Sequence, residues 1–250
     1  MTPLKFCQTL ALTTLLISLT SCTTNTPTSK ASLPEGIPTN YKLIYASDFS
    51  KPDAMDQFRY PDPKAWRISK DADGPTLELF GEGDYRNKIR SPFNFALLKD
   101  KIFTDVVIDA DACSTVQPYG HQDMCIIYGF NNPNQFYYTH IAVAPDPHAH
   151  NCFIVNNADR LAIGKDVSPG ITWGVNQWHH IRIIRKGSTG ETTVYFDDMN
   201  KPIMKATDKT FPTGYVGFGS FDDKGKYRNI RLYAPDAQDK PTDVFKPPVK

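Results

Sequence analysis

The sequence lacks long hydrophobic runs, has few cysteines and carries almost no net charge. Lysine and arginine total 28 of its 250 residues, and aspartate and glutamate total 27. Because the two signs are mixed and nearly equal, nothing points to a nucleic acid or an acidic polymer as an obligatory partner. The sequence also has no Gly-rich phosphate loop, paired Cys-x-x-Cys motif, nucleophile elbow or internal repeat. These absences leave no familiar nucleotide, zinc or serine-hydrolase motif.

The longest apolar run, Leu10–Leu19, predicts a secretory signal peptide rather than a membrane helix. It follows one basic residue, Lys5, is too short to span a bilayer and ends in small residues. We therefore expect residues 1–21 to be a signal peptide and the protein to be exported.

The end of this run resembles a bacterial lipobox. Residues 19–22 read Leu-Thr-Ser-Cys, and in a lipobox the cysteine is acylated and becomes the first residue of the mature chain. We expect a lipid anchor at Cys22 that tethers the protein to a membrane of the cell envelope. Thr23 after the cysteine favours the outer membrane over the inner one. The alternative is an ordinary signal peptide with a chance cysteine.

Composition divides the remaining chain into a tether, a body and a tail. Residues 22–40 are rich in Thr, Ser and Pro, which predicts a flexible tether. Residues 235–250 contain four more prolines and little to bury, which predicts a disordered tail. Residues 41–234 are then one domain with a substantial core. Its three cysteines, at positions 113, 125 and 152, permit at most one internal disulfide.

The body alternates apolar and polar residues with period two, and no apolar stripe keeps helical spacing for long. Turn-forming residues separate the alternating segments. The pattern predicts an all-β fold, a two-sheet antiparallel jelly-roll sandwich. We expect strands at residues 42–46, 65–69, 76–80, 94–98, 103–113, 123–130, 135–143, 150–156, 178–186, 192–198, 214–221 and 227–233.

All six histidines lie in the middle of the chain, at positions 121, 140, 148, 150, 179 and 180. Histidine titrates near neutral pH and is the commonest metal ligand. If Asn131–Asn134 forms a four-residue hairpin loop, Cys125 lies opposite His140 and Ile127 opposite Tyr138. One face of this hairpin is then mostly apolar, whereas the other carries Asp123, Tyr138 and His140.

The neighbouring strands extend this polar face. A turn at residues 117–120 would place strand 103–113 alongside, adding Asp109 and Asp111 and bringing Cys113 opposite Cys125. The strand that follows would add His150, Cys152 and Asn156, with Phe153 and Val155 on the core side.

The outer face of a curved jelly-roll sheet often forms a groove, and aromatic faces beside hydrogen-bonding groups suit sugars. The alternative is the ordinary solvated face of an antiparallel sheet. The candidate acid, base and orienting groups for cleaving a glycosidic bond are His140, Asp123, His121 and His150. The candidate substrate-binding residues are Tyr138, Phe136, Asp109, Asp111, Asn156, Arg160 and Arg182. A structural role is the default for His179 and His180.

A divalent metal is a further possibility that the sequence leaves open. His148 and Asp146 in a Pro-containing loop could ligate an ion together with His140 or Asp123. Alternatively, oxygen ligands such as Asp48 near the first strand and Asp222 or its neighbour near the last could hold a structural calcium.

Three segments carry a family resemblance: residues 45–49 (YASDF), 178–182 with 194–198 (WHHIR and VYFDD) and 214–223 (GYVGFGSFDD). They resemble the concanavalin A-like lectin/glucanase superfamily, including laminin-G-like domains. More narrowly, residues 121–130, 136–140 and 146–151 are similar to exported bacterial proteins grouped near the 3-keto-disaccharide hydrolase domain family. The resemblance implies carbohydrate as the substrate class.

No Glu-x-Asp-x-x-Glu motif of retaining glucanases is present. Two main functions therefore stay open. The first is a tethered glycoside hydrolase or lyase that uses the His/Asp groove. The second is a non-catalytic carbohydrate-binding or adhesion lipoprotein, and a structural envelope protein is a third possibility.

Overall fold

The computed structural model describes residues 1–2, 32–72 and 74–245. The expected signal peptide, the lipobox with Cys22 and most of the tether lie outside the described residues. Within the described part, no helix is long and apolar enough to cross a membrane. Its helical segments are two short 3-10 helices, η1 (Ala54–Gln57) and η2 (Pro63–Ala65).

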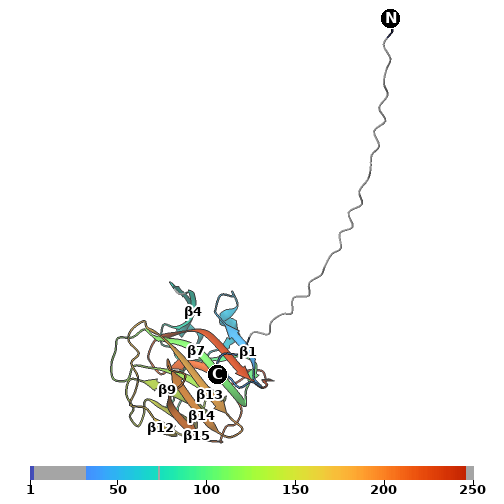
Figure 1. The fold of residues 1–250 in the computed structure, drawn as a ribbon. Coiled ribbons are helices and arrows are strands. Elements are labelled where there is room, and N and C mark those ends of the chain that lie inside the picture. Colours follow the sequence, from blue (N-terminus) through green and yellow to red (C-terminus); the bar gives the residue numbers. More distant parts are fainter. Residues whose placement is uncertain (3–31, 73, 246–250) are drawn as a thin grey trace. The chain divides into compact units, whose positions relative to one another are not determined.

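The strands of the described residues pair antiparallel throughout and form two large sheets (Figure 1). The nine-stranded sheet runs in the order β12 (Gly164–Val167), β15 (Pro202–Thr207), β14 (Glu191–Phe196), β13 (Trp178–Lys186), β7 (Asp105–Ser114), β17 (Gly225–Ala234), β4 (Gly74–Leu79) and β3 (Trp66–Asp71), with β1 (Lys42–Ser47) pairing with β17. The seven-stranded sheet runs in the order β11 (Leu161–Ala162), β10 (Asn151–Asn156), β9 (Gln135–Ala142), β8 (Asp123–Asn132), β16 (Tyr215–Ser220), β5 (Asn94–Leu98) and β2 (Phe58–Arg59). A small third sheet pairs β6 (Lys101–Ile102) with β18 (Gln238–Asp239).

The predicted all-β, two-sheet antiparallel jelly-roll sandwich is confirmed, and every expected strand is present. The strands that the pattern did not indicate are β2, β6, β11, β12, β15 and β18. Most of them have two to four residues, too few to display a period of two. The longer β15 begins at Pro202 and lies next to the edge strand of its sheet.

The main core lies between the two sheets. Along β8, Met124, Ile126 and Tyr128 belong to this core, whereas Cys125 and Ile127 belong to a second apolar cluster. Since successive side chains of a strand point to opposite faces, the second cluster covers the outer face of the seven-stranded sheet. This outer face is therefore largely filled rather than an open groove.

Both ends of the described body cover an outer face. Ile37 packs with Val107 and Tyr233 on the outer face of the nine-stranded sheet. At the other end, the Phe245 ring lies 5.5 Å from that of Phe95 on the outer face of the seven-stranded sheet.

The predicted boundaries at residues 41 and 235 therefore shift outward. The compact unit begins at Leu33 rather than at residue 41. The segment expected to be disordered from residue 235 instead contributes β18, and the Tyr215 hydroxyl donates to the Pro241 carbonyl at 2.8 Å. The prediction of a disordered tail is wrong up to residue 245 and lies outside the described residues beyond it.

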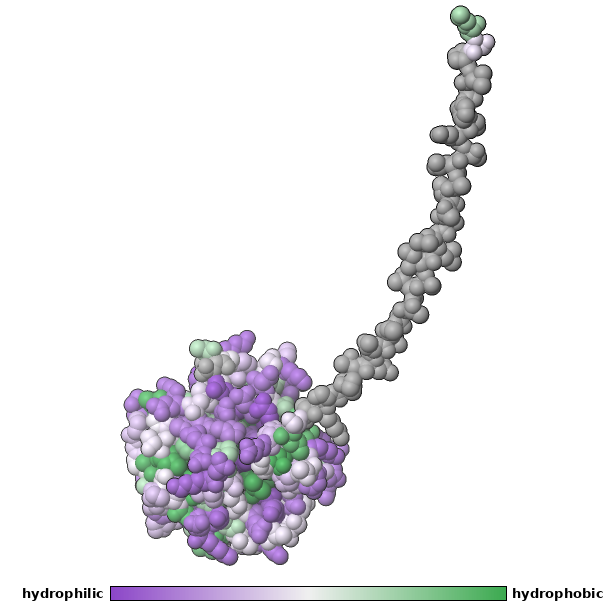
Figure 2. Space-filling model, in the orientation of Figure 1, coloured by the Kyte–Doolittle hydropathy of each residue, from purple (hydrophilic) through white to green (hydrophobic). Residues whose placement is uncertain are grey.

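On the face shown in Figure 2, hydrophilic residues are interspersed with small hydrophobic areas. The large apolar side chains exposed on the body are Leu43, Phe80, Tyr119 and Leu161, which are far apart in the sequence. Isolated exposed apolar residues of this kind are normal for a globular protein and mark no docking surface.

The expected hairpin has the predicted register, although its turn differs. Cys125 pairs with His140 and Ile127 with Tyr138, as predicted. The loop is tighter than expected because Asn132 already pairs with Gln135. A bulge restores the register, and it contains Gly129 at φ +56°, a conformation that glycine adopts without strain.

The expectation that strand 103–113 lies beside β8 is wrong. β7 is in the centre of the nine-stranded sheet, whereas β8 is in the other sheet. The connection crosses the sandwich, held by buried Gln122, whose Nε2 donates to the carbonyl of Gly174 at 2.7 Å. Consequently Cys113 and Cys125 lie in different sheets and cannot form a disulfide with each other.

The side chains of β10 point to the opposite faces of the sheet from those predicted. Phe153 pairs with Tyr138 and belongs to the outer cluster, while Cys152 belongs to the main core. Asn151, not His150, pairs with His140. The loop before β10 includes His150 at φ +46°, and this left-handed residue shifts the alternation that the sequence alone suggests.

Candidate active site

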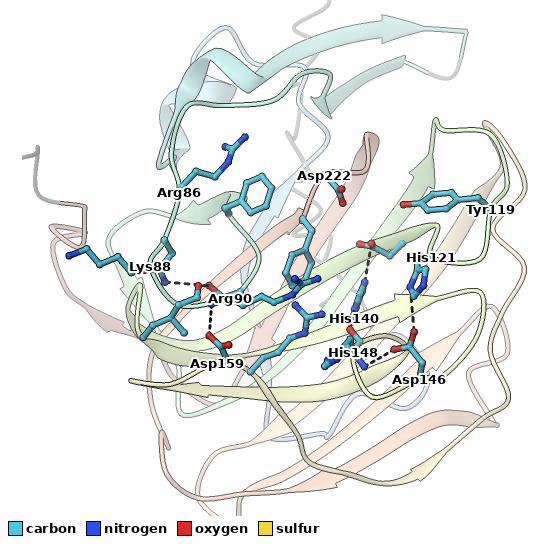
Figure 3. A pocket seen from close by; sticks show the side chains of 17 residues that line it. Arg86, Lys88, Arg90, Tyr119, His121, His140, Asp146, His148, Asp159 and Asp222 are labelled. Carbon is cyan, nitrogen blue, oxygen red and sulfur yellow. Dashed lines mark hydrogen bonds and ion pairs between the residues drawn. The ribbon is translucent and has the colours of Figure 1, made fainter.

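A cavity of about 910 Å³ opens on the outer face of the seven-stranded sheet (Figure 3). Its lining comes from the segment before β5, the β7–β8 crossover, the β9–β10 loop, the residues after β10 and the end of β16. The residues that line it are Arg86, Asn87, Lys88, Ile89, Arg90, Ser91, Phe93, Tyr119, His121, Asp123, His140, Asp146, His148, Asp159, Arg160, Phe221 and Asp222.

His140 and Asp123 meet at the floor of this pocket. His140 Nε2 lies 2.9 Å from Asp123 Oδ2, and the two side chains are only 5% and 4% exposed. The two atoms are close, but Nε2 makes no hydrogen bond of acceptable geometry to this oxygen. This convergence of β8 and β9 side chains follows from the register predicted above.

The hydrogen-bond partners restrict where the protons of His140 lie. Its Nδ1 is 3.0 Å from the carbonyl oxygen of His148, which can only accept, so Nδ1 carries a hydrogen. The Asp123 carboxylate lies at the other ring nitrogen, 2.9 Å from Nε2.

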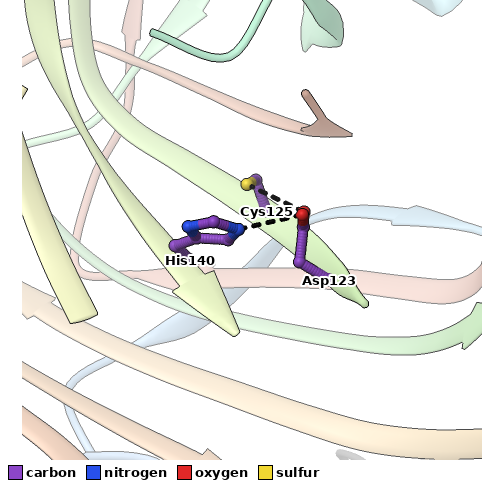
Figure 4. A group of neighbouring side chains, drawn as sticks. All are labelled: Asp123, Cys125 and His140. Atoms are coloured by element: carbon purple, nitrogen blue, oxygen red, sulfur yellow. Dashed lines mark hydrogen bonds and ion pairs between the residues drawn. The ribbon is translucent and has the colours of Figure 1, made fainter. Parts of the chain in front are cut away.

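Cys125 completes a buried group of three potential metal ligands (Figure 4). One ligand atom from each of Asp123, Cys125 and His140 lies within 4.8 Å of the others, and this is the group of three found among the described residues. A carboxylate, a thiol and an imidazole are ligands that zinc accepts. Here, however, burial raises the pKa of the Cys125 thiol well above its usual value, and the thiol donates to Asp123.

A second carboxylate, that of Asp223, contacts the residues at the floor of the pocket. Asp223 accepts a hydrogen bond from the Asp123 backbone N–H at 2.7 Å and one from the Tyr119 hydroxyl at 2.6 Å. Burial raises the pKa of Asp223 to about 6, and the negative charges of Asp123 and Asp222 add to this effect. Three carboxylates thus crowd one end of the pocket.

His121 and His148 lie on the wall of the pocket next to Asp146. His121 Nδ1 is 3.5 Å from the Asp146 carboxylate, and its side chain is 62% exposed. The backbone N–H of His148 donates to the same carboxylate at 2.6 Å, which fixes the loop. The wall therefore carries a second histidine–carboxylate pair, and this one is open to solvent.

Arg160 lies against the aromatic side of the pocket. Its guanidinium carbon is 4.6 Å from the centre of the Phe221 ring and 5.7 Å from that of Phe153. Its Nε and Nη1 atoms are buried and have no hydrogen-bond partner. Of the seven predicted substrate-binding residues, Arg160 alone lines this cavity.

Tyr138 and Phe136 are on the predicted face but are fully buried in the outer cluster. They lie beneath the pocket and cannot stack on a sugar there. Asn156 is exposed and pairs with Gln135 at the far end of the hairpin, away from the residues that line the pocket. The rings were predicted to line an open groove, but the segments that cover this face bury them and fill most of that groove.

Asp109, Asp111 and Arg182 lie on the nine-stranded sheet, so the prediction that they share the groove is wrong. Arg182 makes two hydrogen bonds to Asp109, at 2.7 and 2.8 Å. Asp111 accepts from Asn229 at 2.7 Å and lies 3.1 Å from His180 Nδ1. Their partners explain why these charged groups remain buried or half-buried.

His150 is also outside the pocket lining. It is fully buried, its Nδ1 accepts from the Ala142 backbone N–H, and its Nε2 lies 3.0 Å from Ser168 Oγ. Burial lowers its pKa to about 4. A neutral imidazole with both nitrogens engaged holds the loop in place and does not face a substrate.

The two predicted metal sites are not assembled as expected. His148 and Asp146 line the pocket, but neither belongs to the group of potential ligands formed by Asp123, Cys125 and His140. Asp48 is exposed and accepts from Ser50, whereas Asp222 lines the pocket. The described residues thus give no gathered oxygen ligands for a calcium ion that includes Asp48.

Several pocket residues were not singled out from the sequence. Arg86, Lys88 and Arg90 alternate along the segment before β5. This alternation of basic residues was the one available signal. Tyr119 gave none, because its contact with Asp223 joins the crossover to the residues after β16.

No family model matches the sequence, and a search of curated proteins finds no match. Several solved structures are similar to this chain. The carbohydrate-binding module CBM66 from Bacillus subtilis is 15% identical, with 77% of this chain and 94% of that chain covered and a TM-score of 0.47. Peanut lectin is 9% identical, with coverages of 77% and 97% and a TM-score of 0.46.

Alginate lyase AlgAT5 of polysaccharide lyase family 7 is 12% identical, with 78% of this chain and 94% of that chain covered and a TM-score of 0.43. At such identities the likeness concerns the fold alone. The narrower similarity to the 3-keto-disaccharide hydrolase domain family stays a prediction.

Proposed function

We propose that the pocket binds a saccharide and cleaves it by acid–base chemistry, as a glycoside hydrolase or lyase. The observation that carries this proposal is that two histidine–carboxylate pairs face one cavity, His140–Asp123 at the floor and His121–Asp146 on the wall. Glycosidic cleavage requires one group that gives a proton and another that takes one, on either side of the bond.

The two pairs have different roles in this proposal. The exposed His121 exchanges a proton with the substrate, since its imidazole is open to the cavity and Asp146 orients it. His140 positions the β9–β10 loop through the His148 carbonyl, and Asp123 beside it is the second acid–base group, at the floor of the pocket. Phe93 and Phe221 line the same cavity, with the guanidinium groups of Arg86 and Arg160 against their rings.

The test is a cleavage assay of the purified full chain on a panel of polysaccharides and 3-keto-glycosides, with and without chelator. We expect His121→Ala to lower kcat by about 100-fold or more while leaving the unfolding transition unchanged, because the side chain is exposed. His180→Ala is the matched control, because His180 also lies beside a carboxylate but on the other sheet. Equal activity of the His121→Ala variant would overturn the catalytic role.

His140→Gln is a better probe of the floor than His140→Ala. The histidine is buried rather than outward-facing, and alanine would leave the Asp123 carboxylate buried without its partner. We expect the glutamine variant to fold and to lose turnover because the β9–β10 loop shifts.

One observation favours a second candidate, a non-catalytic saccharide-binding protein. His140 Nε2 is buried beneath the pocket surface, so the floor pair does not reach a ligand in this conformation. Saturable binding of a saccharide without release of products, in the wild type and at all pH values tested, would select this candidate.

For localisation, we propose an exported lipoprotein anchored at Cys22, in the outer rather than the inner membrane. The lipobox-like sequence at residues 19–22 supports the anchor. Cys22→Ala should move the protein from the membrane fraction to the soluble fraction. Persistence in the membrane fraction would refute the anchor.

A further inference from the structure

Buried polar atoms without partners are concentrated around the pocket. Among the described residues, seven buried side-chain nitrogen or oxygen atoms have no hydrogen-bond partner, and three of them belong to Tyr138 and Arg160. A fourth, His140 Nε2, lies 2.9 Å from the Asp123 carboxylate. Folded proteins rarely leave buried donors unpaired, because desolvation of the donor is then uncompensated. Such a concentration indicates groups that a ligand completes.

Arg160 carries two of these unpartnered atoms. Its guanidinium rests against Phe221 and Phe153, and the Tyr138 ring is stacked on Phe153 with centroids 5.1 Å apart. The Tyr138 hydroxyl and the Arg160 Nε and Nη1 atoms are thus unpartnered groups placed over the same aromatic rings. A guanidinium offers parallel N–H donors that match a carboxylate.

The same side of the pocket carries further positive charge. Arg86, Lys88 and Arg90 lie together on one side, opposite Tyr119 and His121 (Figure 3). Asp159 is the acidic residue nearest to them in this view, and one of its oxygens accepts from the Arg90 backbone N–H at 2.9 Å.

The carboxylates of Asp123 and Asp146 are each engaged by a histidine on the opposite side. The cavity is therefore polarised, although its formal charges nearly balance.

We infer that the ligand is an acidic saccharide and that Arg160 receives the carboxylate of a uronic acid residue. The inference rests on the proposed function, because it names the substrate class of the same pocket. In this arrangement the carboxylate pairs with Nε and Nη1 of Arg160 above Phe221, and the Arg86–Arg90 segment faces the rest of an anionic chain. The whole-chain charge gives no hint of this, since the polarisation is local.

The test compares ligands that differ only in the carboxylate. Calorimetric titrations of the full chain use oligogalacturonates and their methyl esters of equal length, together with glucuronate- and mannuronate-containing oligosaccharides, their neutral counterparts and a sulfated oligosaccharide. We expect the acid of at least one pair to bind 10-fold or more tightly than its uncharged form. Tighter binding of the sulfated sugar than of every uronate would overturn the assignment to a carboxylate.

Two variants locate the contact. Arg160→Gln should weaken binding of the acid by 10-fold or more and leave any binding of the ester unchanged. Arg231→Gln is the matched control and should change affinity less than 2-fold, because Arg231 is exposed on β17 of the nine-stranded sheet and does not line the pocket.

The outcomes separate the two proposals. Equal or tighter binding of neutral saccharides would overturn the acidic-ligand inference and leave the proposed function standing. Absence of binding to any saccharide would overturn both. Acid binding that survives Arg160→Gln with unchanged affinity would refute the role of Arg160.

Discussion

Buried charged groups are hydrogen-bonded on one outer face of the sandwich and lack hydrogen bonds on the other. On the nine-stranded sheet, the Arg182 guanidinium makes two hydrogen bonds to Asp109 and a third to the Glu35 carbonyl. On the seven-stranded sheet, Arg160 Nε and Nη1 and His140 Nε2 are buried without hydrogen bonds. Both faces are partly covered by segments near the ends of the described body, and the cavity of about 910 Å³ lies on the seven-stranded sheet.

The hydrogen-bonded charged groups of the nine-stranded sheet stabilise the fold, whereas the unsatisfied groups of the seven-stranded sheet are available to a ligand. A buried ion pair with all donors satisfied tolerates no loss of a partner. An unsatisfied buried group lowers the stability of the folded state and is retained where a ligand supplies the missing partner. Composition cannot distinguish the two faces, because both contain histidine, aspartate and arginine.

The largest effect is expected on the satisfied face. Arg182→Ala leaves the Asp109 carboxylate buried without its partner, so we expect the free energy of unfolding to fall by about 3–5 kcal/mol in urea titrations. Lys186→Ala, which removes an exposed pair with Glu191 from the same strand, should cost less than about 1 kcal/mol. If both variants lost equally little, the contrast between the faces would fail.

The next effect concerns pH on the pocket face. Because the folded-state pKa of Asp223 is raised from 3.8 to about 6, the folded chain holds a proton that the unfolded chain has released between these values. Its stabilising contribution is complete below pH 4 and is lost as the pH rises through 6. We therefore expect Asp223→Asn to gain about 2 kcal/mol relative to the wild type between pH 4 and 7. Parallel stability–pH curves would contradict this.

A smaller effect tests the C-terminal cover of the pocket-bearing sheet. Phe245 is half-buried and packs on Phe95 and Phe130. We expect Phe245→Ala to lower the unfolding free energy by about 1–2 kcal/mol, less than for a fully buried phenylalanine. Asp243→Ala, an exposed neighbour, serves as the control. An unchanged midpoint for Phe245→Ala would restore the prediction of a disordered tail.

The smallest effect is expected at the unsatisfied arginine. Since Arg160 Nε and Nη1 make no hydrogen bonds, Arg160→Gln should change the free energy of unfolding by no more than about 0.5 kcal/mol without a ligand. A loss of about 2 kcal/mol would show that this guanidinium supports the fold, as Arg182 does, and would remove the distinction between the two faces.

The strands and the His140–Asp123 contact were both predictable from the sequence. Period-two alternation located β8 and β9, and the register of their hairpin put the two side chains on one face. A change in the turn did not matter, because the bulge near Gly129 compensates for it. Local patterns suffice where the partners lie within one hairpin.

The composition of the pocket was less predictable. Asp109 and Asp111 alternate with apolar residues, as polar residues do on a strand of either sheet. The pattern therefore could not reveal that β7 joins the nine-stranded sheet, whereas β8 joins the seven-stranded one. The contact of Tyr119 with Asp223 joins residues 104 positions apart. For Phe153, one left-handed residue at position 150 was enough to reverse the expected face.

The sequence by itself determined that the chain is all β, where its main strands lie and that His140 meets Asp123, because alternation and hairpin register are local properties. The tertiary structure alone decided which sheet each strand joins, that the outer aromatics are covered and that two buried nitrogens of Arg160 are left without hydrogen bonds. Those features depend on crossovers and covering segments that bring distant residues together. Steric fit and desolvation decide that assembly, and neither leaves a periodic signal in the chain.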